Sequence, residues 1–428
     1  MLCASETIRI YLPIKLLIIC YYTFNATYLF RRHAFASASF SIPTIAVLSI
    51  AITANKFPSI FSFGGYLSRD VYTRRTTAIA SGAIVIALSI HFLVALILTN
   101  EHKITNLKIS LSDLKIIEKL KWPFTITGGV LLYLTSPQNL FFYVSYASWK
   151  SGPLLDVPGL KLLGIILLSV VLGWTIIKEG YFGWSLLYNP VFIAALFFLF
   201  YFQFLRGERS TSLSAIYTLG VLYFMFMNKS LAKKLYTSLL YGLLLFIFME
   251  SIAVLRTTVS AGMGYEKLYS YIVQFRVSNI SLIPQMYWHM LHVIDLYHSG
   301  VWLGGESFLN IVPQSVPGFV AEALGYNRPE SGAWKLAEYR NHAGGMFSVA
   351  LAYWNLGIFG VVLFSAINAS CLSIIDNVTV KESKIYLPAF IALSGLAFVA
   401  MGYGFLTLIR AYQVIFLVVS IIFIVKHA

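Results

Sequence analysis

The sequence predicts an all-α, polytopic integral membrane protein, and two observations lead to this class. The 428 residues are 58% hydrophobic and only 11% charged, with a mean hydropathy of +0.77, whereas a soluble domain carries about 25% charged residues. The chain also offers many apolar runs close to the ~20 residues that a helix needs to cross a bilayer. We expect about eleven transmembrane helices, within a range of about 10–12. In chain order the expected spans are 10–30, 41–55, 77–99, 123–146, 160–177, 183–204, 212–228, 236–254, 346–371, 386–408 and 411–426.

The ends of these runs carry the signals of a membrane boundary. Aromatic residues make up 16% of the chain, as expected for interfacial belts of Tyr and Trp. The first run lacks a short apolar core followed by a small-residue cleavage site, so we interpret it as the first anchor. Cys3, Cys20 and Cys371 lie in or beside predicted spans. They are too few and too scattered for a disulfide framework or a zinc site.

The net charge of +14 is better explained by membrane orientation than by nucleic acid. The positive residues are spread over several loops instead of gathering on one soluble domain, so we expect no nucleic-acid partner. Loops on the cytoplasmic side are enriched in Lys and Arg, which makes 103–122 and then 228–235 the strongest cytoplasmic candidates. Alternation of the spans then places 255–345 outside. The loop 56–76 carries four positive residues and disagrees with this pattern.

The spans divide the chain into three parts. Residues 1–254 form a membrane domain with about eight spans, and 346–428 form a second with about three. Between them lies 255–345, which we expect to be a long periplasmic loop with short interfacial helices. Loops of this length usually carry function, and this one holds four of the eight histidines.

Within the loop, 280–298 ("ISLIPQMYWHMLHVIDLYH") mixes aromatic residues with His and predicts a helix lying along the interface. On a helix, His289 and His292 are neighbours, with Asp295 a further step around. These residues supply two or three metal ligands at best, and no HExxH-like pattern accompanies them. We therefore expect no metal ion and no cofactor.

Arginines supply the clearest candidate binding groups. Arg206 and Arg209 flank Gly207 in "RGER", a short connector that alternation places outside. Two guanidinium groups at this spacing are suited to one phosphate or pyrophosphate. Alternatively, both side chains extend to lipid headgroups.

The long loop adds further arginines, namely Arg256, Arg276, Arg328 and Arg340. Any one of them is compatible with a structural ion pair. Together with the "RGER" pair they predict an external cationic bowl, which suits a pyrophosphate better than a neutral solute.

The stretch 339–360 ("YRNHAGGMFSVALAYWNLGIFG") places Arg340, His342 and two glycines directly before a predicted span. The start of a helix favours anions, and His accepts protons near neutral pH. This patch is a candidate for binding a lipid pyrophosphate and deprotonating an acceptor, or simply for capping the helix at the interface.

Several sequence features together resemble the Wzy-type O-antigen polymerases, also called oligosaccharide repeat-unit polymerases. These features are the span pattern and three segments: "GER" at 207–209, "GGESFLNIVPQSVPGF" at 304–319, and "FSVALAYWNLGIFGVVLF" at 347–364 with its N-x-G-x-x-G pattern. The resemblance covers roughly 180–371, while the N-terminal third matches only in being hydrophobic.

The resemblance implies a GT-C-like membrane glycosyltransferase of lipopolysaccharide biosynthesis in the bacterial inner membrane. Its partners would be an undecaprenyl-pyrophosphate-linked glycan donor and acceptor, membrane lipid, and a chain-length regulator. An acceptor hydroxyl would attack C1 of the donor sugar with inversion, and undecaprenyl pyrophosphate would leave. The residues that we expect to serve are His342, Glu306 and Glu338 as proton acceptors, and Arg209, Arg276, Arg206, Arg256 and Arg340 as the pyrophosphate clamp.

Three other classes remain open from the sequence. O-antigen ligases share much of the pattern, including a functional His near the end of the long loop, with which His342 could align. A polysaccharide or lipid transporter would be expected to show more intramembrane carboxylates, and Glu250 is the main one here. A membrane acyltransferase would need a partner for a His in a span, and His91 has no obvious one in the sequence.

Overall fold

We describe the fold from a computed structural model of the whole chain. The residues that the structure describes are 2–53, 74–100, 110–136, 154–155, 158–180, 183–201, 209–226, 230, 233–234, 236–237, 240, 282–316, 318–325, 332–339, 346–381, 384–403 and 405–427.

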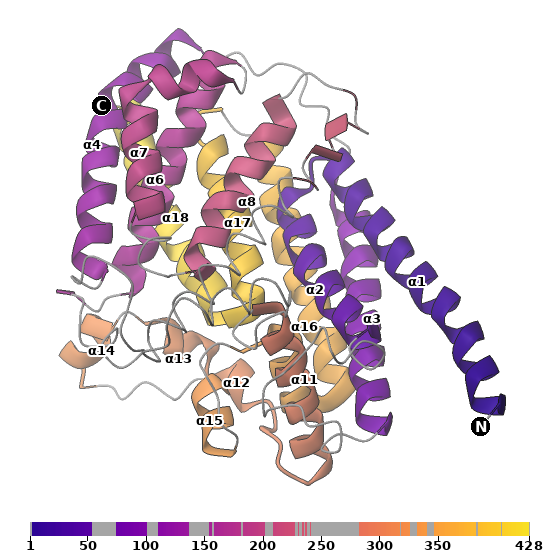
Figure 1. The fold of residues 1–428 in the computed structure, drawn as a ribbon. Coiled ribbons are helices and arrows are strands. Elements are labelled where there is room, and N and C mark those ends of the chain that lie inside the picture. The colour runs from indigo at the N-terminus through magenta and orange to yellow at the C-terminus, as the bar shows by residue number, and fades with distance from the viewer. Residues whose placement is uncertain are drawn as a thin grey trace, which may run out of the picture.

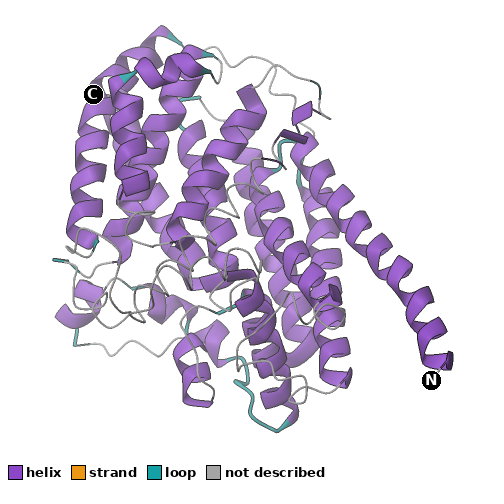
Figure 2. Cartoon of the chain, in the orientation of Figure 1, coloured by secondary structure: helices purple, strands orange, loops and turns teal. Residues whose placement is uncertain are grey.

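The elements formed by these residues are helices (Figure 2). In the first part of the chain they are α1 (Leu2–Arg31), α2 (Phe35–Thr53), α3 (Arg74–Leu98), α4 (Leu111–Thr135), α6 (Pro158–Glu179), the 3₁₀ helix η1 (Trp184–Tyr188), α7 (Pro190–Phe200) and α8 (Arg209–Phe226). In the second part they are α11 (Leu282–His298), α12 (Glu306–Leu309), α13 (Ile311–Ser315), α14 (Gly318–Ala323), α15 (Gly332–Tyr339), α16 (Ser348–Lys381), α17 (Leu387–Tyr403) and α18 (Phe405–His427).

The predicted class of all-α membrane protein is confirmed in its coarse form. Five helices among the described residues are long and apolar enough to cross a membrane. They contain the stretches Phe35–Ile52, Arg75–Leu98, Gly159–Glu179, Ser348–Val378 and Leu408–His427. Three shorter apolar helices accompany them, at Pro190–Phe200, Ala215–Phe226 and Leu387–Gly402. The count of eleven spans and the GT-C-like architecture stay predictions.

The centre of the bundle is α17, which packs against α8, α18, α2, α6 and α16. Small residues allow close approach at this centre. Gly173 of α6 lies against Pro388 at the start of α17, and the indole N–H of Trp174 donates to the carbonyl of Ile385 at 2.7 Å. A Cβ on Gly173 would come within 2.5 Å of the proline ring, so only glycine fits this crossing.

Helices α4 and α6 also cross closely. A Cβ at Gly164 would lie 3.0 Å from the backbone oxygen of Gly128. Transmembrane helices pack by such small-residue contacts because lipid supplies no hydrophobic drive between them.

We therefore expect Gly164→Ala to destabilise the protein by about 1–3 kcal/mol, the usual cost of overpacking. Thermal unfolding of the purified protein in detergent measures the effect. The matched control is Gly82→Ala in α3, where nothing lies within 4 Å of an added Cβ. Equal melting temperatures for the two variants would contradict the close crossing.

Two sequence expectations about helices are wrong. Residues 183–204 do not form one span, because the chain breaks between η1 and α7. Asn189 caps α7 by accepting from the N–H groups of Val191 and Phe192 at 3.1 and 3.3 Å, and Pro190 takes the first position of the helix. Proline suits that position because its missing N–H has no intrahelical partner there.

The second correction concerns α11, which is not an interfacial helix. It packs against α16, α2 and α3, and every side chain from Met286 to Ile294 is buried. His289 and His292 are therefore enclosed by other helices, while His298 at the end of the helix is exposed.

Other boundaries also shift. Helix α4 begins at Leu111, ahead of the predicted 123, because the hydroxyl of Ser110 caps it by accepting from the N–H of Asp113. The predicted span 236–254 lies almost wholly outside the described residues.

The two ends of the bundle carry different parts of the chain (Figure 1). We call one the loop end. It holds α12–α15 and the start of α16, where the N–H of Met346 donates to the carbonyl of Gly402 at 2.9 Å. The opposite end, which we call the lysine end, holds the C-terminus of the chain. There Lys426 pairs with the buried Asp113 of α4 at 2.9 Å.

Candidate functional site

The site begins with a break in α16 at the loop end. The backbone leaves helical geometry at Leu356 (φ −140°, ψ 24°) and Gly357 (φ 60°, ψ −142°). A positive φ favours glycine, which has no Cβ to clash. A Cβ on Gly357 would also lie 2.8 Å from the hydroxyl of Tyr297 on α11. The N-x-G-x-x-G pattern of 355–360 therefore builds a break, and α11 packs closely against it.

Residues 301–307 dock onto this break through three hydrogen bonds, and a fourth within α16 orients the Asn355 side chain. The N–H of Leu303 donates to the carbonyl of Trp354 at 3.0 Å, and the indole of Trp354 donates to the carbonyl of Val301 at 2.9 Å. The N–H of Ser307 donates to the side-chain oxygen of Asn355 at 3.0 Å, while the Asn355 amide donates to Leu351 at 2.7 Å. A buried backbone group needs a partner, and here Leu303 serves the Trp354 carbonyl beside the break.

This docking fixes the position of Glu306. Gly304 and Gly305 both have positive φ, at 58° and 87°, and turn the chain into α12. Glu306 is the first residue of that helix, and its N–H donates to Leu303 at 2.9 Å. Its carboxylate is half-exposed, and both oxygens lie 2.5 Å from Nζ of Lys335 on α15.

Aromatic side chains pack around the break. Tyr339 of α15 meets Trp354 edge-on, with ring centres 6.2 Å apart, and Tyr297 meets Tyr353 in the same way at 5.2 Å. The Tyr353 hydroxyl also lies 3.4 Å from Nε2 of His298. Elements α11, α12, α15 and α16 therefore meet at one place, which we call the break site: Tyr297, Leu303, Glu306, Lys335, Tyr339, Trp354, Asn355 and Gly357.

Of the predicted site residues, the structure brings Glu306 into the break site and places Glu338 exposed on α15. Arg209 is the first residue of α8, and α8 begins at the loop end of the bundle. Near the other end of α8, at the lysine end, the Phe224 ring packs edge-on against Phe30 of α1. Side-chain geometry is not described for Arg209. The remaining candidates lie outside the described residues: Arg206, Arg256, Arg276, Arg340 and His342.

Sequence reasoning missed two members of the break site as functional residues. Asn355 stood in a recognised pattern, but nothing in the pattern showed that its amide holds a distant loop. Lys335 is separated from Glu306 by 29 residues. An i,i+4 rule or a motif cannot detect a pair at that separation.

A second polar cluster lies near the lysine end of α16. The carboxylate of Asp376 accepts from the N–H groups of Ala36 and Ser37 at 2.7 and 2.9 Å, and from the Ser37 hydroxyl at 2.7 Å. Asp376 thus caps α2 from another helix, which explains why α2 begins at Phe35 instead of the predicted 41. Nε2 of His91 lies 2.9 Å from the Ser37 carbonyl, so His91 belongs to this cluster.

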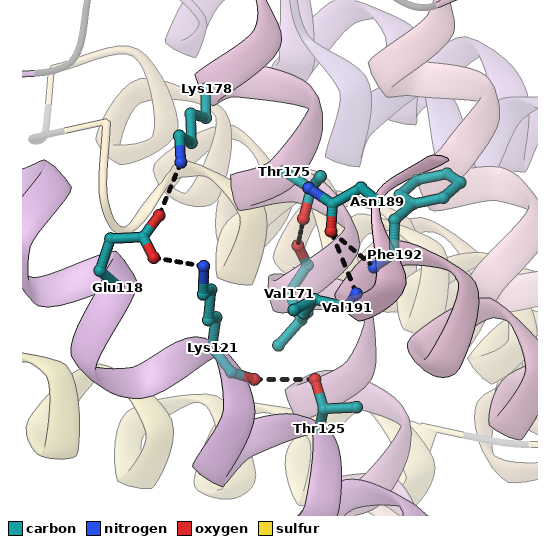
Figure 3. Close-up of polar contacts among 9 residues, drawn as sticks. All are labelled: Glu118, Lys121, Thr125, Val171, Thr175, Lys178, Asn189, Val191 and Phe192. Carbon is teal, nitrogen blue, oxygen red and sulfur yellow. Dashed lines mark hydrogen bonds and ion pairs between the residues drawn. The ribbon is translucent and has the colours of Figure 1, made fainter. Parts of the chain in front are cut away.

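At the lysine end, α4, α6 and α7 form a set of ordinary capping and ion-pair contacts (Figure 3). Glu118 pairs with Lys121 and, at 2.6 Å, with Lys178. Hydrogen bonds from Lys121 and then Lys178 lower the pKa of the Glu118 carboxyl. All three side chains are partly exposed, so this pairing gives a reference for ion pairs that lie far from the break site.

Within the described residues, no three His, Cys, Asp or Glu side chains gather in a way that would hold a metal ion. On α11, Nδ1 of His289 accepts from the N–H of Phe347 at 3.2 Å, which gives this histidine a role in seating the start of α16. Comparisons of the chain with protein-family models, with curated proteins and with solved structures give no match.

Proposed function

We propose that this protein is a Wzy-type O-antigen polymerase, a membrane glycosyltransferase that joins undecaprenyl-pyrophosphate-linked oligosaccharide repeat units. One observation carries the proposal. Two of the three segments that resemble that family, 304–319 and 347–364, contact each other at the break in α16, where the N–H of Ser307 donates to the side-chain oxygen of Asn355. These two segments are far apart in the sequence, so their contact supports a shared site, and Glu306 lies in the first of them.

In the proposed reaction, a hydroxyl at the non-reducing end of the acceptor attacks C1 of the donor's reducing-end sugar. The new C1–O bond forms on one face while the bond to the pyrophosphate oxygen breaks on the other, so the anomeric configuration inverts. Glu306, Glu338 or His342 takes the proton of the hydroxyl. Arginines stabilise the charge that develops on the departing pyrophosphate, with Arg209 and Arg276 foremost, followed by Arg206, Arg256 and Arg340.

The proposed location is the bacterial inner membrane with the loop end in the periplasm. The lysine end carries Lys121, Lys178, Lys426 and the end of α1 at Arg31. Cytoplasmic loops are enriched in such residues, so this end faces the cytoplasm in the proposal. The donor and acceptor then meet the break site from the outer leaflet.

An O-antigen ligase is the main alternative, because it would use the same donor at a similar site. A transporter is less well supported, although Glu250, the main intramembrane carboxylate in the sequence, lies outside the described residues. Among the described residues, the buried carboxylate of Asp376 already accepts three hydrogen bonds from α2 and so acts as a cap.

Glu306→Gln is expected to reduce polymer yield by at least about tenfold, at the lower end of the range for removing a general base. The measurement is the lipopolysaccharide ladder of a deletion strain that carries the variant. The matched control is Glu118→Gln at the lysine end, which should leave the ladder intact. A normal ladder from Glu306→Gln would transfer the proton-acceptor role to Glu338 or His342.

Arg209→Ala and Arg276→Ala test the clamp in the same strain. Each is expected to shorten the ladder and lower its yield, because a charge-assisted contact to pyrophosphate is lost. Lys178→Ala serves as the control for loss of a positive charge elsewhere. Normal chain length and yield in both arginine variants would remove the clamp from the account.

A further inference from the structure

The resting geometry of Glu306 conflicts with its proposed role as a proton acceptor. A proton acceptor needs a free oxygen within hydrogen-bond reach of the acceptor hydroxyl. Both oxygens of Glu306 lie 2.5 Å from Nζ of Lys335, and Oε1 also accepts from the Asn310 amide at 3.3 Å. In this state Lys335 and Asn310 engage three of the roughly four lone-pair sites of the carboxylate, so an acceptor hydroxyl must compete with Lys335 for Glu306.

Stability does not account for the pair. The two side chains are 47% and 25% exposed, and ion pairs at such exposure contribute little to folding. Helix α15 has other attachments: Leu336 is fully buried, and the Tyr339 ring packs against Trp354. Releasing Lys335 therefore costs the fold little, and its flexible ammonium can turn to another anion.

We infer that Lys335 leaves Glu306 to bind the pyrophosphate of the lipid-linked donor. Glu306 is then free to accept the proton of the acceptor hydroxyl. This inference rests on the proposed function and extends it by naming a further pyrophosphate-binding residue. It also makes the order of events depend on the donor. Without donor, Lys335 competes with the acceptor hydroxyl for Glu306; with donor bound, the cation sits on the leaving group and the carboxylate is open.

The step balances in charge and atoms. The ammonium of Lys335 moves from the Glu306 carboxylate to the donor pyrophosphate, and no covalent bond changes in this step. The acceptor oxygen then forms its bond to C1 while its proton passes to the Glu306 carboxylate. The C1–O bond to phosphorus-bound oxygen breaks, and its electron pair leaves with undecaprenyl pyrophosphate, whose added negative charge stays beside Lys335. Release of product and loss of the proton restore the ion pair.

The test measures binding of undecaprenyl pyrophosphate to the purified full-length protein in lipid nanodiscs. Because Glu306 competes with the ligand for Lys335, the two halves of the pair should respond in opposite ways. Lys335→Met is expected to weaken binding by about tenfold to a hundredfold, the range for one charge-assisted hydrogen bond. Glu306→Gln is expected to bind as tightly as the wild type or more tightly, and Lys335→Arg to bind within about threefold of it.

The lysine-end pair provides the control. Lys178→Met and Glu118→Gln break a comparable ion pair at the lysine end, drawn in Figure 3, and should leave binding unchanged. Unchanged binding in Lys335→Met would overturn the inference. So would equal weakening in Lys335→Met and Glu306→Gln, since that is the result of a purely structural pair.

Failure of the inference is distinguishable from failure of the proposed function. A deletion strain that loses its polymer, together with Lys335→Met protein that binds normally, would reject the role of Lys335 and keep the polymerase. The converse result is also distinct. If binding depends on Lys335 but deletion of the gene leaves the polymer ladder unchanged, the anion site stands and the polymerase is rejected.

Discussion

Gly360→Ala is expected to abolish polymer formation and to destabilise the protein by at least about 1–3 kcal/mol, the cost of overpacking. Past the break, α16 folds back so closely on itself that a Cβ at Gly360 would fall on the carbonyl oxygen of Ala352. That oxygen belongs to the backbone and cannot turn aside as a flexible side chain would. The helix must shift, and Trp354 and Asn355, which hold the loop carrying Glu306, lie between these two positions.

Two measurements check this expectation: the melting temperature in detergent and the lipopolysaccharide ladder of the complemented deletion strain. Gly220→Ala in α8 is the matched control, because nothing lies within 4 Å of an added Cβ there. Gly357→Ala should resemble Gly360→Ala, through its positive φ and the nearby Tyr297 hydroxyl. A stable Gly360→Ala protein with a normal ladder would mean that the break does not position the site.

The second large effect is expected from Asp376→Ala, on stability. Its carboxylate caps α2 from α16, and its removal leaves the buried N–H groups of Ala36 and Ser37 without that acceptor. Unpaired buried donors cost about 1–3 kcal/mol each, and the surrounding membrane offers no water to replace the carboxylate. We expect a loss of about 2–6 kcal/mol from the two donors.

Thermal unfolding in detergent measures the effect. Ser37→Ala serves as a milder variant, because it removes one of the three hydrogen bonds to Asp376. That variant removes only the hydroxyl contact and should cost about 1 kcal/mol, as for one ordinary hydrogen bond. Asp376→Asn should fall between the two, because its amide oxygen still accepts while its NH₂ faces other donors. If Asp376→Ala were as stable as Ser37→Ala, the two backbone hydrogen bonds of the cap would add nothing to the stability of the protein.

Much of the helical framework could be predicted from the sequence, since apolar runs of spanning length have few alternatives to a helix in a membrane. The predictions failed where a polar side chain acted at a boundary. Asn189 divided a continuous apolar run, and Asp376 extended α2 from more than 300 residues away. Helix α11 was misjudged because its aromatic and His residues suggested an interface, whereas α2, α3 and α16 pack around it and His289 and His292 are buried.

The candidate site could be predicted only in part. Glu306 was among the predicted proton acceptors and lies in the segment 304–319. Its contact with Lys335 depends on how α15 docks against Trp354, and the hold of Asn355 on Ser307 depends on a break that only folding creates. Neither contact has a signal in local composition or spacing.

The most direct test of the proposed polymerase is a gel of lipopolysaccharide from a strain that lacks this gene. The account predicts that the ladder collapses to core plus a single repeat unit, and that the wild-type gene restores it. Loss of all glycan from the core, with polymer accumulating on the lipid carrier, would point to a ligase. An unchanged ladder would contradict the central claim.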